Sequence, residues 1–223
     1  MFKKKKKKDK RDDLLLLVPL HVKNVLDVGC GSGILGAKLR KKGIEVVGIE
    51  KDEQAYAQAR GKINKAILAD VEELDLSYPV GYFDCILFAD ILEHLRDPVS
   101  ILMKYGKYLN DKGFVIASIP NVRYYKIILR LLFGGTWDYV DKGILDVTHI
   151  RFFTLVNMKE LFIKAGYSVL CMQRNLVASR GFRLLNFILF NSLKDFLTYQ
   201  YYFKLRKASD REILVPKRRI HQF

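Results

Sequence analysis

The chain has 223 residues, of which 50% are apolar and 28% are charged. This length suits one domain, and the composition allows a buried core, which excludes an extensively disordered protein. The formal net charge of +15 is concentrated at the ends. Residues 1–13 carry eight cationic and three acidic side chains, and residues 204–219 carry seven and two. We expect basic tails at 1–13, disordered, and at 209–223, around a folded domain at 14–208.

Cysteine usage and the absence of long apolar runs bear on the compartment. The three cysteines, Cys30, Cys85 and Cys171, are far apart and lack metal-ligand spacing. An odd count without a signal peptide is typical of the reducing cytoplasm, where we expect this protein. No stretch approaches the roughly 20 apolar residues of a membrane-spanning helix. The basic ends would suit nucleic acid or an anionic membrane, although solubilising tails are the simpler interpretation.

Apolar runs bounded by turn signals alternate with amphipathic segments along the chain. The apolar runs predict strands at 24–27, 45–50, 66–69, 83–88, 113–118, 167–176 and 198–207. Helices are predicted at 34–41, 52–60, 98–109, 154–165 and 182–197, and also within 124–133. Asp52 and Asp97 are placed to cap their helices, and Pro98 suits a first helical position. This alternation predicts a parallel sheet with helices on both faces, whose last two strands pair antiparallel.

A glycine-rich run, DVGCGSG at 27–33, follows the first strand and opens a helix. Glycines there allow positive φ and a close approach of the backbone to a ligand, beside the free amides of a helix N-terminus. Asp27, Glu50 and Asp70 end the first three strands, so their carboxylates should converge on the crevice at that edge. Carboxylates suit an ammonium, a sulfonium and ribose hydroxyls and repel phosphates, which favours S-adenosylmethionine over a dinucleotide.

Two other interpretations stay open. Residues 31–36, GSGILG, are a literal GxGxxG, and an acid ends the second strand, as in the dinucleotide-binding fingerprint. An NAD(P)-dependent oxidoreductase is therefore the alternative enzyme, against which Asp27 and Asp70 weigh. The third interpretation is a methyltransferase-like module that binds nucleic acid through the basic ends, and the lack of a base-stacking motif weighs against it.

Residues 25–33, VLDVGCGSG, resemble the first motif of class I S-adenosylmethionine-dependent methyltransferases. The resemblance covers roughly residues 20–208. It implies an α/β, Rossmann-like, seven-stranded, mostly parallel sheet with helices on both faces and the last strand antiparallel. It further implies that Glu50 binds the ribose, that Asp70 binds the adenine amine, and that Val71 offers a backbone amide to the ring. The implied cofactor set also contains Asp27, Gly29, Cys30, Gly31, Gly33, Lys51, Ala89 and Asp90.

Further resemblances bear on the acceptor, the molecule that receives the methyl group. Residues 83–95, FDCILFADILEHL, resemble the fourth motif of a branch with two kinds of member. These are the ubiquinone-biosynthesis O-methyltransferases and enzymes encoded or fused with glycosyltransferases in surface-polysaccharide pathways. The runs DVTHIRFFT at 146–154 and IPNV at 119–122 resemble the second kind. Methyl transfer to a hydroxyl of a small-molecule, sugar or lipid-linked acceptor is implied.

Methyl transfer from a sulfonium is an in-line displacement, which needs alignment and a deprotonated acceptor. His94 and His149 are the candidate proton acceptors, with structural roles as the alternative. Arg151 is expected to bind an acidic group of the acceptor, or else to pair with Asp146. Tyr124 is a candidate acceptor-binding residue within 120–154, which we expect to form a lid insertion together with 178–197.

Two alternatives concern a metal and a membrane. No metal is expected, but Asp90, Glu93 and His94 are spaced to share one helix face. Similar ubiquinone-pathway enzymes hold a divalent ion with an acid, a glutamate and a histidine at this spacing. The apolar segment 182–197, preceded by Arg180 and Arg183, either packs on its own domain or forms an interfacial helix at a membrane.

Overall fold

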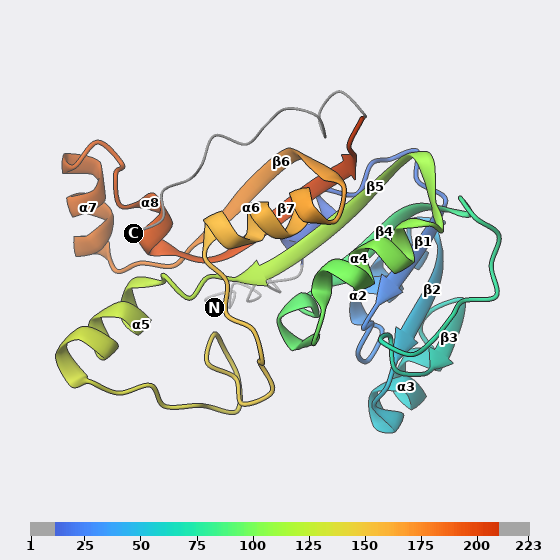
Figure 1. Ribbon diagram of the computed structural model, residues 1–223, viewed down its shortest axis with the longest axis horizontal. Coiled ribbons are helices and arrows are strands. Elements are labelled where there is room, and N and C mark those ends of the chain that lie inside the picture. Colours follow the sequence, from blue (N-terminus) through green and yellow to red (C-terminus); the bar gives the residue numbers. More distant parts are fainter. Residues whose placement is uncertain (1–11, 210–223) are drawn as a thin grey trace, which may run out of the picture.

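The computed structural model describes residues 12–209; most of both predicted basic tails, 1–11 and 210–223, lies outside the described residues. Its centre is a seven-stranded sheet with the order β3-β2-β1-β4-β5-β7-β6 (Figure 1). The strands from β3 to β5 pair in parallel, and β7 pairs antiparallel with both β5 and β6. The predicted fold class is therefore confirmed. The strands are β1 (Asn24–Val28), β2 (Glu45–Glu50), β3 (Lys65–Leu68), β4 (Phe83–Ala89), β5 (Leu109–Pro120), β6 (Tyr167–Leu176) and β7 (Thr198–Lys207).

The helices follow the strands much as predicted. They are α1 (Asp12–Leu15), α2 (Ile34–Arg40), α3 (Glu53–Arg60), the 3₁₀ turn η1 (Leu92–His94), α4 (Pro98–Gly106), α5 (Tyr125–Leu129), the π-helical turn η2 (Arg130–Gly134), α6 (Leu155–Lys164), α7 (Arg180–Ile188) and α8 (Lys194–Leu197). Helix α1 starts at residue 12, two residues before the domain start that we expected at 14. The predicted caps are present, because Asp52 accepts from the Ala55 amide and Asp97 accepts from the Ser100 amide.

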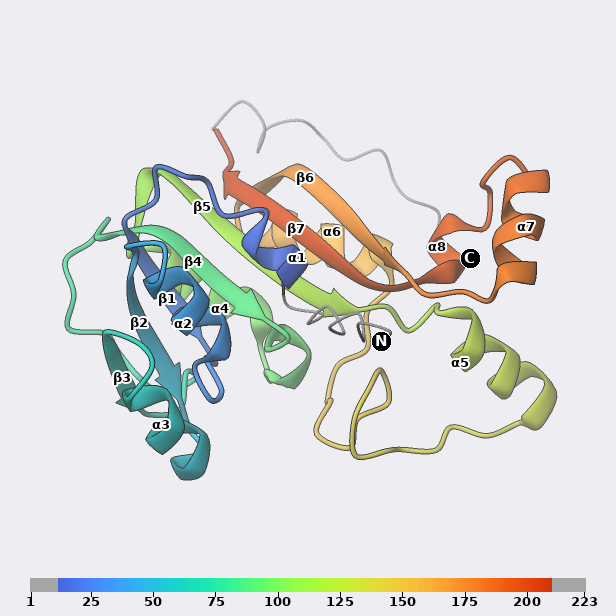
Figure 2. The ribbon, with the colours of Figure 1, turned by 180° about the vertical axis from the view of Figure 1, so that it is seen from behind.

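Helices cover both faces of the sheet. On one face α4 and α6 bury a large apolar cluster, with Leu102 and Phe162 fully inside (Figure 1). On the other face α1, α2 and α3 bury a second cluster that contains Leu14, Leu39 and Ala59 (Figure 2). The two layers leave the carboxyl ends of β1, β2, β4 and β5 free to form a site.

The boundary between α4 and β5 differs from the prediction. The helix ends at Gly106 rather than 109, and β5 begins at Leu109 rather than 113. Leu109 pairs with Phe83 whereas Phe114 pairs with Cys85, so the start of β5 is irregular. Sequence periodicity does not report such a bulge, because its position depends on the neighbouring strand.

The single helix predicted at 182–197 is wrong, since two helices, α7 and α8, occupy that segment. Phe190 and Asn191, between them, have φ values of 50° and 62° in the left-handed region. Asn186 organises the break: its Oδ1 accepts from the Leu193 amide at 3.0 Å, and its Nδ2 donates to Asn191 Oδ1 at 3.1 Å. An asparagine that bonds to backbone groups competes with continued helix, which explains the end of α7.

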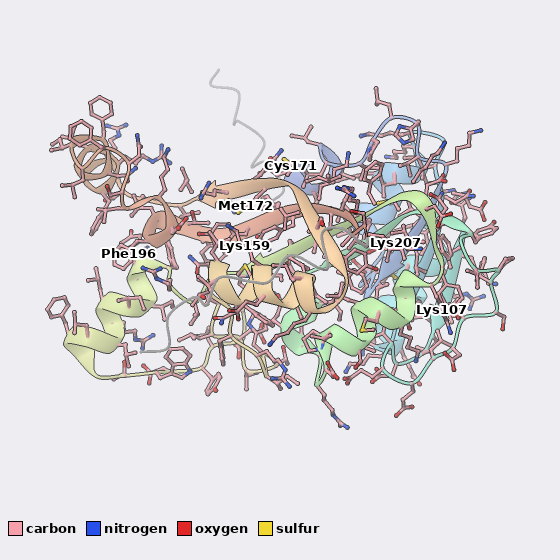
Figure 3. All side chains as sticks on the ribbon, turned by 45° about the horizontal axis from the view of Figure 1, so that its top comes forward. Lys107, Lys159, Cys171, Met172, Phe196 and Lys207 are labelled. Atoms are coloured by element: carbon pink, nitrogen blue, oxygen red, sulfur yellow. The ribbon has the colours of Figure 1, made fainter. Side chains whose placement is uncertain are left out.

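The two predicted insertions share a third apolar cluster at one end of the molecule. Tyr125 of α5 packs against Phe182 of α7 with ring centroids 4.5 Å apart, and against Phe196 of α8 at 6.2 Å. Figures 1 and 2 both place α5 and α7 at the same end, and Figure 3 labels Phe196 beside them. Ile144 and Leu145 complete the cluster, so the segments at 120–154 and 178–197 fold against each other.

Candidate functional site

The glycine loop after β1 uses each glycine differently. Gly29 and Gly33 have φ of 71°, and a side chain on either would collide with Ile91 or with Ala59 of α3. Gly31 also has a positive φ, of 54°, but an added Cβ there would meet no atom within 4 Å. Gly29 and Gly33 therefore let the loop pack closely against Ile91 and Ala59, whereas the space beside Gly31 is open.

Glu50, at the end of β2, holds this loop. Its Oε2 accepts from the Gly31 amide at 2.8 Å, and its Oε1 accepts from the amides of Lys51 and Asp52, both at 2.9 Å. Lys62 supports the loop from the other side by donating to the Ser32 carbonyl at 2.7 Å. A carboxylate with one oxygen bound to the loop is placed to accept from a ligand that lies over Gly31.

The other predicted cofactor residues surround the same edge of the sheet. Asp27 is buried in β1, with 1% of its surface exposed. Asp70 follows β3 and lies 3.7 Å from the Lys51 ammonium, which links the ends of β2 and β3. Val71 is buried, and its carbonyl accepts from the Tyr105 hydroxyl at 2.9 Å. The structure thus joins Lys51 and Asp70 at the ends of β2 and β3, and it places Asp27 inside β1.

Cys30 lies inside the loop but turns into the core. Burial, followed by the negative charges of Asp27 and Glu50, raises the pKa of its thiol to about 12. The thiol packs under β2, where a Cβ on Gly48 would come within 2.6 Å of its Sγ. Cys30 is therefore a packing residue of the loop and not a nucleophile, because only a thiolate would react.

The end of β4 carries a strained residue. Ala89 is the last residue of β4, and Asp90 after it has a φ of 56°, in the left-handed region. Asp90 is held there by Ser118 at the end of β5, whose Oγ donates to its carboxylate at 2.5 Å. Gln200 of β7 donates to the same carboxylate oxygen through Nε2. Three strands thus fix one carboxylate at the edge of the sheet.

A cavity of about 410 Å³ opens beside Asp90. Both predicted histidines, His94 and His149, line it. Its walls come from the ends of β4 and β5, the start of β7, helix α1 and the loop before α6. The remaining lining residues are Leu14, Asp90, Glu93, Ser118, Pro120, Lys142, Gly143, Asp146, Tyr199, Gln200 and Tyr202. This volume suits a small-molecule ligand.

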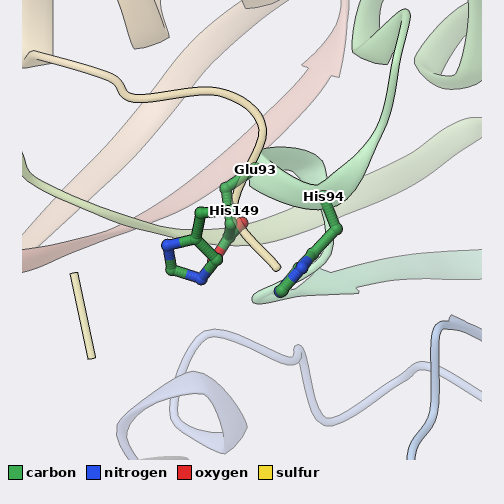
Figure 4. A group of neighbouring side chains, drawn as sticks. All are labelled: Glu93, His94 and His149. Carbon is green, nitrogen blue, oxygen red and sulfur yellow. The ribbon is translucent and has the colours of Figure 1, made fainter. Parts of the chain in front are cut away.

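The two histidines and Glu93 form a compact group (Figure 4). The imidazoles pack edge to face with centroids 4.7 Å apart. Each Nδ1 faces a backbone carbonyl, that of Thr148 at 3.1 Å for His94 and that of Ile144 at 2.9 Å for His149. A carbonyl only accepts, so both Nδ1 atoms carry hydrogen, and in the neutral rings both Nε2 atoms offer lone pairs.

Electrostatics favour a neutral His94. Burial lowers the pKa of His94, and the neighbouring His149 lowers it further, while the Thr148 carbonyl opposes the shift. His149 Nε2 lies 3.9 Å from Glu93 Oε1. This distance is too long for a hydrogen bond, whereas a cation between the two groups would contact both the lone pair and the carboxylate.

The metal alternative therefore has a different composition from the one that spacing indicated. One ligand atom from each of Glu93, His94 and His149 lies within 4.8 Å of the others. Asp90 is instead bonded to Ser118 and Gln200. Two imidazoles backed by carbonyls, with one carboxylate, are a donor set that fits a divalent cation.

Two predicted acceptor residues lie away from this cavity. Tyr124 is buried in the insertion cluster, and its hydroxyl donates to the Val177 carbonyl at 2.9 Å. Arg151 donates through Nε to the Arg96 carbonyl at 3.0 Å and lines a separate depression beside α4. Asp146 accepts from Thr148, and no ion pair joins it to Arg151 within the described chain. The structure does not bring Tyr124 or Arg151 to the histidines.

Sequence reasoning missed the contribution of β7. Gln200 and Tyr202 alternate along it and both reach the cavity, opposite Pro120 and Ser118 of β5. The available signal was a glutamine within an otherwise aromatic buried strand, since a buried polar side chain needs a partner. Lys142 and Tyr199 carried no comparable signal.

Comparison with known proteins gives the family. A model described as a methyltransferase domain matches residues 2–172. The chain therefore belongs to the methyltransferase domain family, the class I S-adenosylmethionine-dependent enzymes. A ubiquinone biosynthesis O-methyltransferase of Thiobacillus denitrificans is 35% identical over 136 residues, which are 54% of this chain and 58% of that protein. The enzyme of the same name from Psychrobacter arcticus is 30% identical over 163 residues, 66% and 59% of the two chains.

Among solved structures, an S-adenosylmethionine-dependent methyltransferase from Archaeoglobus fulgidus superimposes with a TM-score of 0.67 at 18% identity. The match covers 88% of this chain and 92% of that one. At this identity the likeness concerns the fold. The chain spans a little over half the length of the curated relatives, 58% of the Thiobacillus protein. Those alignments therefore cover only part of each relative.

Proposed function

We propose that this protein transfers the methyl group of S-adenosylmethionine to a hydroxyl oxygen of a small molecule bound in the cavity beside Asp90. The observation that carries the proposal is the position of that cavity. It lies at the carboxyl ends of β4 and β5, next along the sheet from the glycine loop and Glu50, and it contains His94 and His149. A cofactor over the loop and an acceptor in the cavity would meet near Asp90.

The residues have separable tasks. Glu50 would accept from the ribose hydroxyls, and the acidic edge formed with Asp27 and Asp70 would favour the cationic cofactor. The neutral Nε2 of His94 would take the hydroxyl proton as the oxygen attacks the methyl group. Asp90, fixed by Ser118, would hold the junction between the two binding regions. In such a displacement most of the rate enhancement comes from aligning the acceptor oxygen with the methyl group. A rigid Asp90 between the two binding regions would therefore favour the reaction.

The relatives named for ubiquinone biosynthesis support oxygen as the methylated atom. A phenolic hydroxyl, with a pKa near 10, is more easily deprotonated by a neutral histidine than a sugar hydroxyl. We therefore favour an aromatic hydroxyl over a glycan. The polar lining of the cavity, which includes Gln200, Tyr199 and Lys142, offers donors for further oxygen atoms on such a ring.

A second role for the same histidines follows from their geometry with Glu93. The three side chains would hold a divalent cation, and a bound cation would lower the pKa of an acceptor hydroxyl next to it. His94 would then be a ligand and not a base. The two roles predict different responses to a chelator, because removal of the cation affects only the second.

The test uses calorimetry first and turnover second. S-adenosylhomocysteine and NAD are titrated in parallel, and we expect only the first to bind. Tritiated S-adenosylmethionine is then supplied with catechol or with a methyl glycoside, with EDTA or with added magnesium. Methyl transfer to catechol that is lost in His94→Ala and insensitive to EDTA supports the base, whereas loss with EDTA and recovery with magnesium supports the cation. Binding of NAD in place of S-adenosylhomocysteine would overturn the proposal.

A further inference from the structure

Exposed phenylalanines gather at one end of the molecule. Within the described residues only three are exposed: Phe133 at 81%, Phe187 at 74% and Phe190 at 94%. Phe133 lies in η2, Phe187 lies in α7 and Phe190 follows α7 by two residues, and both segments are at the same end of the molecule (Figures 1 and 2). We call the following exposed residues of these segments the apolar tips: Leu131, Leu132, Phe133, Leu184, Phe187, Ile188, Leu189 and Phe190.

The tip of α7 is built to project. Phe182 packs against Tyr125, whereas Leu184, Phe187 and Ile188 are exposed. Phe190 follows in the left-handed region at a φ of 50°, where a bulky side chain is rare. The turn that ends α7 sets this conformation, because the Phe190 amide donates to the Phe187 carbonyl at 3.1 Å and the Asn191 amide donates to the Asn186 carbonyl at 2.7 Å. The Phe190 ring itself is left 94% exposed.

Charge accompanies the apolar tips. No Asp or Glu occurs over residues 113–137 or 175–194, which contain both segments. The exposed cations there are Arg123, Lys126, Arg130, Arg180, Arg183 and Lys194, of which Arg130 pairs with Asp138 just beyond. Apolar side chains flanked by cations and free of acids complement an anionic lipid surface, in which rings enter the acyl boundary and cations meet headgroup phosphates.

We propose that the apolar tips dock the protein on the surface of an anionic lipid bilayer. No helix among residues 12–209 has the length and apolar character to cross a bilayer, so contact would be peripheral. A second copy of the chain is the competing occupant. Symmetric pairing would bring two sets of the same cations together, whereas lipid phosphates neutralise them.

The apolar tips are linked to the cavity through the insertion cluster. Tyr124 of that cluster packs against Tyr199 with centroids 5.3 Å apart, and Tyr199 lines the cavity. A docked protein would hold an acceptor with a lipid tail in the cavity while the tail stays in the bilayer, a point that rests on the proposed function, whereas the docking itself does not.

The experiment is vesicle flotation with the full chain. Vesicles of phosphatidylcholine with about 30% phosphatidylglycerol are compared with pure phosphatidylcholine. We expect binding to the anionic vesicles, and a decrease of about tenfold or more in Phe187→Ser/Phe190→Ser. The matched control is Met103→Ser/Val80→Ser, which removes exposed apolar side chains from α4 and a distant loop and leaves the charge equal. The control should bind like the wild type.

Three outcomes would overturn the proposal. The first is failure of the wild type to bind anionic vesicles. The second is undiminished binding of the Phe187→Ser/Phe190→Ser variant, which would mean that the basic tails alone attract the vesicles. Self-association that disappears in that variant without vesicle binding would mean that the tips pair two copies. Calorimetry with S-adenosylhomocysteine on the same variant separates these results from a failure of the proposed function.

A spectroscopic measurement tests insertion directly. Trp137 is the single tryptophan, so Trp137→Phe/Phe190→Trp places the only indole at the tip. We expect a blue shift of its emission on adding anionic vesicles, and quenching by lipids brominated near the headgroup end of the chain. An unshifted emission under conditions in which the protein floats with the vesicles would contradict insertion of the tip.

Discussion

Substitution of Glu50 by glutamine separates the acceptor chemistry of its carboxylate from its size. In Glu50→Gln the amide oxygen can keep the bonds to the amides of Lys51 and Asp52, because both go to Oε1. The amide nitrogen then replaces Oε2 and faces the Gly31 amide, now 2.8 Å away, donor against donor. The loop loses one charge-assisted hydrogen bond, and the ribose loses an anionic acceptor. Such a bond contributes about 1.5–3 kcal/mol, so affinity should fall about 10- to 150-fold.

The assay is titration calorimetry with S-adenosylhomocysteine, with circular dichroism to verify folding. Glu45→Gln is the matched control, because Glu45 is the exposed first residue of the strand that Glu50 ends. We expect Glu45→Gln to bind like the wild type. An affinity of Glu50→Gln within about twofold of the wild type, or about 0.4 kcal/mol, would refute the role of the carboxylate. An equal loss of S-adenosylhomocysteine affinity in both variants would refute the location of the ligand beside Glu50.

Two further predictions concern packing and titration. Gly48→Ala should lower the free energy of unfolding by about 1–3 kcal/mol in urea, since the new Cβ would lie 2.6 Å from Cys30 Sγ. Gly61→Ala, with open space around its Cβ, should change it by less than about 0.5 kcal/mol, and similar values for both would contradict the packing. In an NMR titration His94 should protonate only below its ordinary pKa of 6.5, and its pKa should rise in His149→Asn, which removes the neighbouring imidazole that lowers it. A His94 pKa above 6.5 would show that burial does not govern it.

The α/β alternation was predictable because its signals are local. A buried parallel strand is an apolar run, and the helices that follow begin at residues such as Asp52 and Asp97, whose side chains bond to amides three residues on. The glycine loop was predictable for the same reason, since positive φ at Gly29, Gly31 and Gly33 is a property of each residue.

The acceptor side was less predictable because it depends on contacts between distant segments. Spacing placed Asp90 with Glu93 and His94, but a left-handed Asp90 turns to Ser118 and Gln200, 28 and 110 residues away. The partner that joins Glu93 and His94 is His149, from a loop whose path is set by packing in the insertions. Local sequence propensity does not predict such contacts between distant segments.

The cofactor side depends on local structure and the acceptor side on contacts between distant segments. This difference explains how one fold can bind the same cofactor while the acceptor changes. Glu50, Gly31 and the carboxylates near them are fixed by β1, β2 and β3, strands whose register depends only on their neighbours in the sheet. The cavity is instead closed by β7 and by the loop at 142–149, which pack against the insertion cluster. Changes in the insertions can therefore reshape the acceptor region without moving the loop that Glu50 holds. For this reason a substitution in the apolar tips should alter lipid binding and leave S-adenosylhomocysteine affinity unchanged, whereas Glu50→Gln should do the reverse.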